Sequence, residues 1–174
     1  FYDNQNKTLP IGMDLSTKIL IDLNKLELEE VNTNSFNIAY FENEKDGFYG
    51  TYYENPAGAS CAIIGLFGDD PNDYMAKCGA KWLHKNGVNV LCISPRKKNY
   101  SHVNYPLERI ETAIGWLKKN GNRKIGIMGM STTGMDSLVA ASYFSDITLT
   151  FALTASDFVW QGFEQGKKDG CREW

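Results

Sequence analysis

The chain has 174 residues, 43% hydrophobic and 22% charged, which is the composition of a globular domain with a core of its own. Its net charge is −3 and its 18 basic residues are scattered, with Arg96–Lys98 as the longest basic run, so nucleic-acid binding is not expected. No apolar stretch approaches the roughly 18–20 residues that cross a bilayer, so no membrane partner is expected. Residues Phe1–Pro10 lack a signal-peptide pattern. Because the first residue is not Met, we expect a processed or trimmed terminus, and the missing signal does not decide whether the protein is exported.

The first 55 residues carry the alternating pattern of half-buried strands. Apolar or aromatic residues alternate with polar ones in three short runs, around Leu26–Val31, Phe36–Tyr40 and Tyr49–Tyr53. This period of two predicts antiparallel strands. Glu44–Gly47 is predicted to form the turn of a hairpin between the last two runs, and Asn55–Gly58 ends the antiparallel segment.

The strands predicted after residue 60 are of another kind. Four continuous apolar runs follow one another along the chain: Cys61–Phe67, Val88–Ile93, Ile125–Met130 and Ile147–Leu153. Continuous apolar runs are typical of strands covered on both faces, as in a parallel sheet.

Three amphipathic helices are predicted between these strands. The first begins at Asp70-Pro71 and ends at Asn86-Gly87, the second ends at Asn120-Gly121, and the third runs from about Thr132 to Phe144. The side chains expected to face the core are, helix by helix, Tyr74, Met75, Cys78 and Trp82; Leu107, Ile110, Ile114 and Leu117; and Met135, Leu138 and Val139.

The alternation of strands and helices defines the predicted fold class. It indicates three right-handed crossovers and an α/β fold with a mostly parallel, doubly wound sheet, preceded by antiparallel strands. No repeat, low-complexity tract or linker divides the sequence. We therefore predict one domain over residues 1–174, with antiparallel strands in residues 1–55 and a parallel core in residues 60–160.

The four cysteines show no metal-site or redox spacing. Cys61 and Cys92 lie inside apolar runs, where a cysteine behaves as a small buried hydrophobe, whereas Cys78 and Cys171 lie elsewhere. Reduced core cysteines are favoured over a disulfide framework, which favours the cytoplasm. No cofactor is predicted.

The segment Ile127–Gly134 carries the clearest chemical pattern. Gly-Met-Ser-Thr-Thr-Gly follows a buried strand and opens a helix, which is the context of a nucleophile elbow, so Ser131 is predicted to be a nucleophile. Gly129 would allow close backbone approach, and the amide of Thr132 would point toward a developing oxyanion. The alternative is that Ser131 is only a helix N-cap.

A second segment follows the first predicted parallel strand. Leu66–Asp70 resembles the loop in which α/β-hydrolases place the second oxyanion-hole amide, so the resemblance implies that the backbone amide of Gly68 or Asp69 is that donor. The alternative is a turn with a helix cap. Asp69-Asp70 also suggests a metal, but no matching histidine or carboxylate spacing accompanies it, so no metal is predicted.

From about residue 48 to 162 the sequence resembles α/β-hydrolases of the dienelactone hydrolase type, and most of all the C-terminal catalytic domain of acyl-CoA thioesterases and bile acid-CoA:amino acid N-acyltransferase. The resemblance lies in Ala62–Gly68, Gly87–Leu91, Leu107–Leu117, Ile125–Ser131 and Ile147–Ser156. It implies an α/β-hydrolase fold, a small acyl ester or thioester substrate, and a serine nucleophile at Ser131.

The sequence departs from the family pattern at two places. The family usually has Gly two residues after the nucleophile, whereas this chain has Thr133 there and Gly only at 134. A β-branched side chain at that position is expected to crowd the close contact between helix and strand. The loop after Phe67 has Asp69-Asp70-Pro71 in place of a glycine-rich run, which puts acyl-CoA specificity in doubt.

The residues after Ser131 include no histidine. His84 is expected near the end of a helix, in a solvated role. His102 follows a parallel strand and is a candidate for lining the pocket, although a catalytic base there would break the nucleophile–acid–histidine order of the family. Asp157 follows the last predicted strand and is a candidate acid or substrate contact, with a turn or cap role as the alternative. Phe158, Trp160 and Phe163 are candidates for a lid, a pocket wall or the core.

Together these features predict a serine hydrolase whose acid and histidine lie beyond residue 174, so that the 174-residue chain is an inactive, C-terminally truncated fragment. Its exposed sheet edge would then be open to another copy, as a homo-oligomer. The alternatives are a hydrolase-like module that binds without catalysis, and an N-acyltransferase.

Overall fold

The computed structural model describes residues 37–66, 74–94 and 105–159. All of these residues belong to the unit Val31–Trp174. The expected alternating run near Leu26–Val31 lies outside the described residues, as do Cys171, Trp160 and Phe163.

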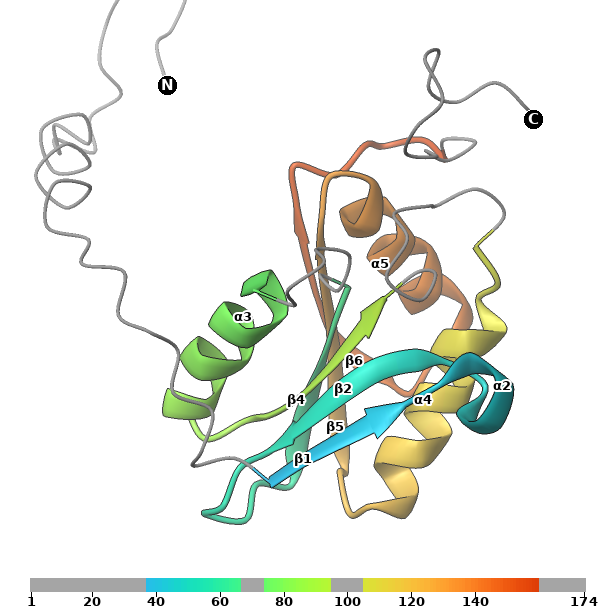
Figure 1. Cartoon of the computed structure of the whole chain (residues 1–174). Coiled ribbons are helices and arrows are strands. Elements are labelled where there is room, and N and C mark those ends of the chain that lie inside the picture. Colours follow the sequence, from blue (N-terminus) through green and yellow to red (C-terminus); the bar gives the residue numbers. More distant parts are fainter. Residues whose placement is uncertain (1–36, 67–73, 95–104, 160–174) are drawn as a thin grey trace, which may run out of the picture. The chain divides into compact units, whose positions relative to one another are not determined.

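The described strands form one mixed sheet in the order β1-β2-β4-β3-β5-β6 (Figure 1). Their bounds are β1 Asn37–Phe41, β2 Tyr49–Glu54, β3 Cys61–Gly65, β4 Asn89–Ser94, β5 Lys124–Met130 and β6 Ile147–Leu153. β1 and β2 are antiparallel, β2 is antiparallel to β4, and β4, β3, β5 and β6 are mutually parallel. This confirms the predicted mostly parallel sheet with antiparallel strands at its amino-terminal side.

The connection between β1 and β2 is longer than a tight turn. The two strands pair as predicted, with Phe41 opposite Gly50, but α2 (Asn43–Asp46) fills the connection with one helical turn. Gly47 ends this turn in the left-handed conformation at φ 80°, which favours glycine. The predicted hairpin is therefore confirmed, and its turn is helical.

Helices cover both faces of the sheet (Figure 1). α4 (Glu108–Lys119) and α5 (Thr132–Tyr143) pack on one face, in a core that includes Ile64, Ile127 and Ala140. α3 (Tyr74–Lys85) packs on the other face. Among the described residues, no helix has the length and apolar character needed to span a membrane.

The predicted inward faces of the helices are partly wrong. On α4 the prediction is confirmed, because Ile110, Ile114 and Leu117 are buried. Trp82 is instead 64% exposed, and α3 buries its smaller neighbours Ala80 and Leu83. Leu138 is 45% exposed.

The error at Leu138 has a physical cause. α5 buries mainly small and polar residues toward the strand ends: Thr133, Gly134, Met135, Asp136, Ser137 and Ala140. The first turns of α5 approach the strands so closely that small residues are favoured on most of the inward face, and Leu138 is left outside. A hydrophobicity pattern therefore places this helix face wrongly.

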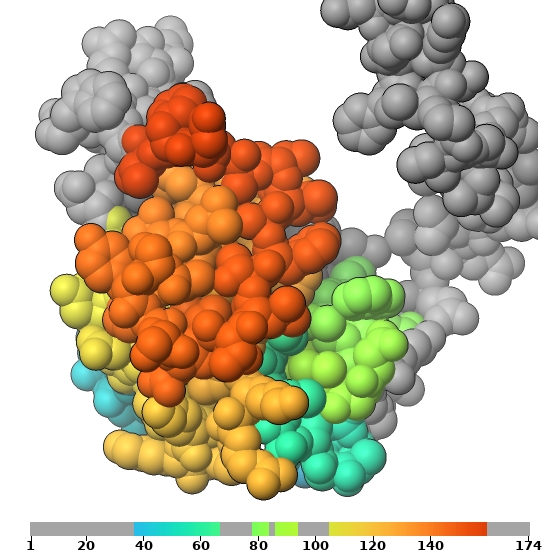
Figure 2. Space-filling view, turned by 180° about the vertical axis from the view of Figure 1, so that it is seen from behind, coloured from blue at the N-terminus to red at the C-terminus, as the bar shows by residue number. Residues whose placement is uncertain are grey.

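β6 lies at the end of the strand order, next to β5 alone among the described strands. Leu149, Phe151 and Leu153 alternate along it and are exposed, Phe151 at 54%. Seen from behind, α5 and β6 form an orange-to-red surface beside the green surface of α3 (Figure 2). No charged residue interrupts β6.

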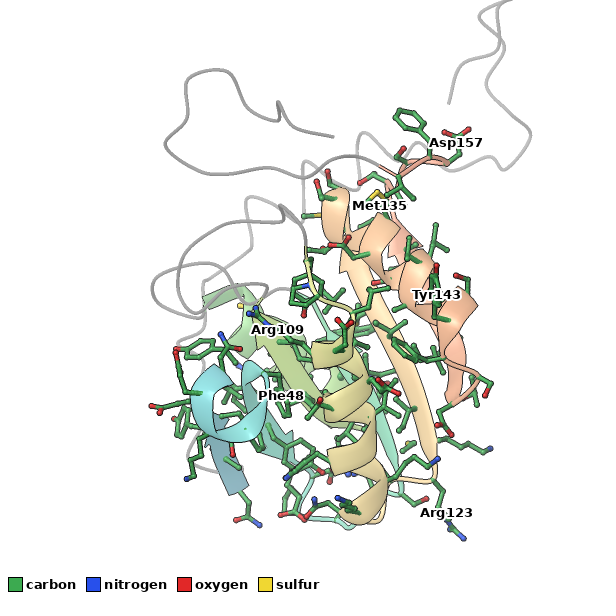
Figure 3. All side chains as sticks on the ribbon, turned by 90° about the vertical axis from the view of Figure 1, so that its right-hand side faces the viewer. Phe48, Arg109, Arg123, Met135, Tyr143 and Asp157 are labelled. Atoms are coloured by element: carbon green, nitrogen blue, oxygen red, sulfur yellow. The ribbon has the colours of Figure 1, made fainter. Side chains whose placement is uncertain are left out.

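A buried amide network joins the ends of the strands opposite Ser131, near Arg123 in Figure 3. Asn89 Nδ2 donates to Asn122 Oδ1 at 2.7 Å, and Asn89 Oδ1 accepts from the Asn55 amide at 2.7 Å. Asn122 Nδ2 donates to the Leu117 carbonyl at 3.1 Å. Burial raises the pKa of the neighbouring Tyr52, against a smaller opposing effect of its hydrogen bond with Asn122.

Candidate active site

Ser131 lies at the junction of β5 and α5 in a strained backbone conformation. Its φ is 54° and its ψ is −121°, and the only other non-glycine residue with positive φ among those described is Thr154. Such a conformation costs about 1–3 kcal/mol and persists only where the surrounding structure imposes it. The side chain of Ser131 is exposed. The structure thus has the sharp strand-to-helix turn that the sequence predicts.

Backbone hydrogen bonds hold both sides of Ser131. Its amide donates to the Leu153 carbonyl at 2.9 Å, which joins the turn to the end of β6. Its carbonyl accepts from the Met135 amide at 3.1 Å, which is the first helical bond of α5. Ser131 is therefore fixed between a strand end and a helix start, with its hydroxyl outside both.

Gly129 is required by close packing beneath the turn. A Cβ placed on Gly129 would lie 2.2 Å from the Thr133 carbonyl oxygen and 2.8 Å from Ser137 Oγ. The first of these neighbours is backbone and cannot rotate away. Gly129 therefore allows the close backbone approach that the sequence predicts at this position.

Gly134 makes the close contact between α5 and the end of β6. A Cβ on Gly134 would lie 3.1 Å from Ala155 Cβ and 3.2 Å from the Leu153 carbonyl oxygen. The family pattern has glycine two residues after the nucleophile, whereas this chain has it one residue later, at Gly134. There it fits against β6. The close contact with β6 is thus made by Gly134, whereas the Thr133 hydroxyl bonds to Met130 of β5.

Thr133 is 8% exposed, and its hydroxyl bonds back across the turn. Thr133 Oγ1 accepts from the Met130 amide and donates to the Met130 carbonyl, each at 2.9 Å. The Thr133 carbonyl in turn accepts from Ser137 Oγ at 2.8 Å. The β-branched residue is thus accommodated, and it links the last residue of β5 to the first turn of α5.

The start of α5 favours a negative charge near Ser131. Thr132 is the first helical residue, and the first amides of a helix have no acceptor within the helix. The first turn of α5 carries no acidic residue, so no side-chain charge there opposes the positive end of the helix dipole. The predicted donors Gly68 and Asp69 lie outside the described residues.

Asp157 lies at the same end of the sheet as Met135, the residue whose amide bonds to Ser131 (Figure 3). Asp157 is exposed and follows β6. Ser156 Oγ accepts from the Phe158 amide at 3.1 Å and donates to the Phe158 carbonyl at 2.8 Å, so the loop turns around Asp157. The structure places Asp157 at the expected edge, and Phe158 beside it is exposed.

Both histidines of the chain precede Ser131 in the sequence. His102 lies outside the described residues, and His84 falls in the last turn of α3, as predicted. Within the described ranges, no group of three or more His, Cys, Asp or Glu side chains is arranged to hold a metal ion.

Sequence reasoning missed two residues that shape this site. Thr154 adopts φ 49° directly after β6, and no local pattern marks a threonine for that conformation. Ser137, in the second turn of α5, has its hydroxyl oxygen 2.8 Å from where a Cβ on Gly129 would lie. The spacing of small residues at Gly129, Thr133 and Ser137 is a pattern that would have indicated it.

Several solved structures share the fold of this chain. An esterase from Pyrococcus furiosus is 20% identical over 69% of this chain and 49% of its own, with a TM-score of 0.54. A hyperthermophilic esterase from the archaeon Pyrobaculum calidifontis is 16% identical over 88% of this chain and 55% of its own, with a TM-score of 0.55. Est1E from Butyrivibrio proteoclasticus is 21% identical over 68% of this chain and 51% of its own, with a TM-score of 0.51.

The chain has the α/β-hydrolase fold. It spans about half the length of these solved structures. No protein-family model matches the chain, and no curated protein matches it.

Proposed function

We propose that this chain carries the nucleophile of a serine hydrolase that acts on a small acyl ester or thioester. The observation that carries the proposal is the conformation of Ser131, which is exposed at φ 54° between a buried strand and a helix start. A serine that served only as an N-cap would adopt an extended backbone and needs no such strain. The esterases that share the fold support an ester as the substrate.

In the proposed reaction Ser131 Oγ attacks the acyl carbon of the substrate. The tetrahedral oxyanion accepts hydrogen bonds from the Thr132 amide and from the amide of Gly68 or Asp69. A histidine takes the serine proton and returns it to the departing alcohol or thiol, and a carboxylate orients that histidine. Water then attacks the acyl-enzyme, which releases the acid and restores Ser131.

We place the histidine and the acid outside the 174 residues. After Ser131 the chain has no histidine, and it spans about half of each solved structure with the same fold. Asp157 is a candidate for substrate contact at the same edge. On this proposal the 174-residue chain alone would be inactive, because the base that Ser131 needs would lie elsewhere.

The finer proposal is a relationship to the dienelactone hydrolase type and to acyl-CoA thioesterases. It rests on the sequence resemblance around Ser131. An amine in place of water as acceptor would make the same site an N-acyltransferase. A hydrolase-like module that binds without catalysis is the second candidate, and the absent histidine favours it.

A fluorophosphonate probe tests the proposal on the protein encoded by the complete gene. We expect covalent labelling at Ser131, located by peptide mass spectrometry, and none in Ser131→Ala. Ser142→Ala, which removes another serine hydroxyl on α5, is the matched control and retains labelling. An unlabelled wild-type protein would favour the binding module. Two activity assays then separate the three enzymatic outcomes. Release of thiol from acyl-CoA would identify a thioesterase, and release of alcohol from a nitrophenyl ester would identify an esterase. Each assay is repeated with an amino acid as acceptor, which would identify an N-acyltransferase.

A further inference from the structure

We infer that Thr133 is a positioning residue for Ser131, acting through the two hydrogen bonds of its hydroxyl to Met130. The inference rests on the proposed function. It adds to it Thr133, at a position where the family that the sequence resembles usually has glycine. Its basis is the way in which the parallel ladder of β5 ends.

The backbone of β5 points alternately toward β3 and toward β6. In a parallel strand the amide and carbonyl of one residue face the same neighbour. The Met128 carbonyl accepts from the Leu66 amide at 2.9 Å on the β3 side, and the Ser131 amide donates to Leu153 on the β6 side. Met130, two residues after Met128, therefore faces the β3 side.

Among the described residues, the pairing of β3 with β5 ends before Met130. Its last register pair is Gly65 with Met128. The hydroxyl of Thr133 takes the place of the next strand residue, since Oγ1 accepts from the Met130 amide and donates to the Met130 carbonyl. One side chain thus satisfies both backbone groups at the open end of the strand.

These two bonds close a short ring around Ser131. The ring runs from Met130 through the strained peptide of Ser131 to Thr133, whose own carbonyl is fixed by Ser137 Oγ at 2.8 Å. Without the hydroxyl, the backbone at Met130 can rotate and Ser131 can relax from φ 54° toward an ordinary value. A displacement of about 1 Å at a reacting group is enough to cost about 100-fold in rate.

The chemistry of the side chain makes the inference specific. Valine matches the shape of threonine but neither donates nor accepts a hydrogen bond, whereas serine keeps both functions. In Thr133→Val of the protein encoded by the complete gene, we expect the turnover number and the rate of fluorophosphonate labelling to fall about 10- to 100-fold. The KM for a nitrophenyl ester should stay near its wild-type value. Thr133→Ser should restore most of the labelling rate.

A further measurement and a control variant separate an effect on the position of Ser131 from an effect on the stability of the fold. Hydrogen exchange at the Met130 amide should be faster in Thr133→Val than in Thr133→Ser. Ser142→Ala is the matched control, because it removes another exchangeable bond from a hydroxyl to the α5 backbone, Ser142 Oγ to the Val139 carbonyl at 2.7 Å. Ser142→Ala should leave the rate of fluorophosphonate labelling and the rate of hydrogen exchange at the Met130 amide unchanged.

The outcomes are distinct. Wild-type labelling together with an unchanged rate in Thr133→Val, normalised to folded protein, would overturn the inference and leave the proposed function intact. A lower melting temperature with an unchanged normalised rate would overturn it equally. Absence of labelling in the wild type would overturn the proposed function, and the inference with it, whatever the exchange rate at Met130.

Discussion

Replacing Gly129 by alanine tests the packing beneath the Ser131 turn. The added Cβ would lie 2.2 Å from the Thr133 carbonyl oxygen and 2.4 Å from its carbon, where non-bonded atoms normally stay about 3.5 Å apart. The Thr133 peptide would have to move by about 1 Å, judged from that contact distance. Both the bonds of its hydroxyl to Met130 and the bond from Ser137 resist this movement.

The expected cost follows from these contacts. Overpacking of a tight site costs about 1–3 kcal/mol, and losing one buried hydrogen bond adds about 1 kcal/mol. We therefore expect Gly129→Ala to lower the free energy of unfolding by about 3 kcal/mol. For a chain of this size that corresponds to a fall of about 6–12 °C in melting temperature.

The assay is thermal and urea unfolding of the variant, followed by circular dichroism. Gly115→Ala is the matched control, because Gly115 lies inside α4 and a Cβ there would meet nothing within 4 Å. That variant should be stabilised by about 0.5–1 kcal/mol through the higher helix propensity of alanine. Equal urea midpoints for Gly129→Ala and wild type would refute the close approach described at Gly129.

Two further predictions concern Tyr52 and the edge strand. Burial raises the pKa of Tyr52 above 10.0, so above about pH 10 the unfolded chain loses this proton first and the free energy of unfolding falls. Tyr52→Phe should remove that part of the fall in alkaline urea titrations, and an equal fall in both proteins would contradict the assignment. Phe151→Lys should reduce concentration-dependent self-association of the 174-residue chain through β6, measured by sedimentation velocity. Trp82→Lys, which changes another exposed aromatic, on α3, should not reduce it, and equal association in all three proteins would exclude β6 as the contact.

The sequence allowed the sheet and the position of Ser131 to be predicted well. Continuous apolar runs identified β3, β4 and β5, because strands buried on both faces leave little place for polar residues. The apolar run at Ile147–Leu153 also marked β6 correctly as a strand, but its expected burial on both faces is wrong, since no residue of β6 is buried. Glycines at 87 and 121 marked helix ends, since both adopt the left-handed conformation. The strained turn at Ser131 was predictable because a short glycine-containing segment joins a buried strand to a helix.

What could not be predicted depends on contacts between distant segments. Leu138 was expected inside, but the approach of α5 to β6 at Gly134 turns the small residues of the helix inward. Thr133 was expected to crowd the contact between helix and strand. Its hydroxyl bonds to Met130 could not be predicted, because they depend on where β3 stops pairing with β5. Both outcomes follow from the three-dimensional course of strands that are far apart in sequence.

The amide network of Asn55, Asn89 and Asn122 also bears on how this fold can change. It fastens the ends of the strands that lie opposite Ser131, and its hydrogen bonds use side chains that take no part in the proposed chemistry. The strands are thereby held together at the ends that lie away from Ser131. If the proposed function holds, substitutions near Ser131 can change the reaction at little cost to folding. The asparagines, in contrast, should tolerate few replacements.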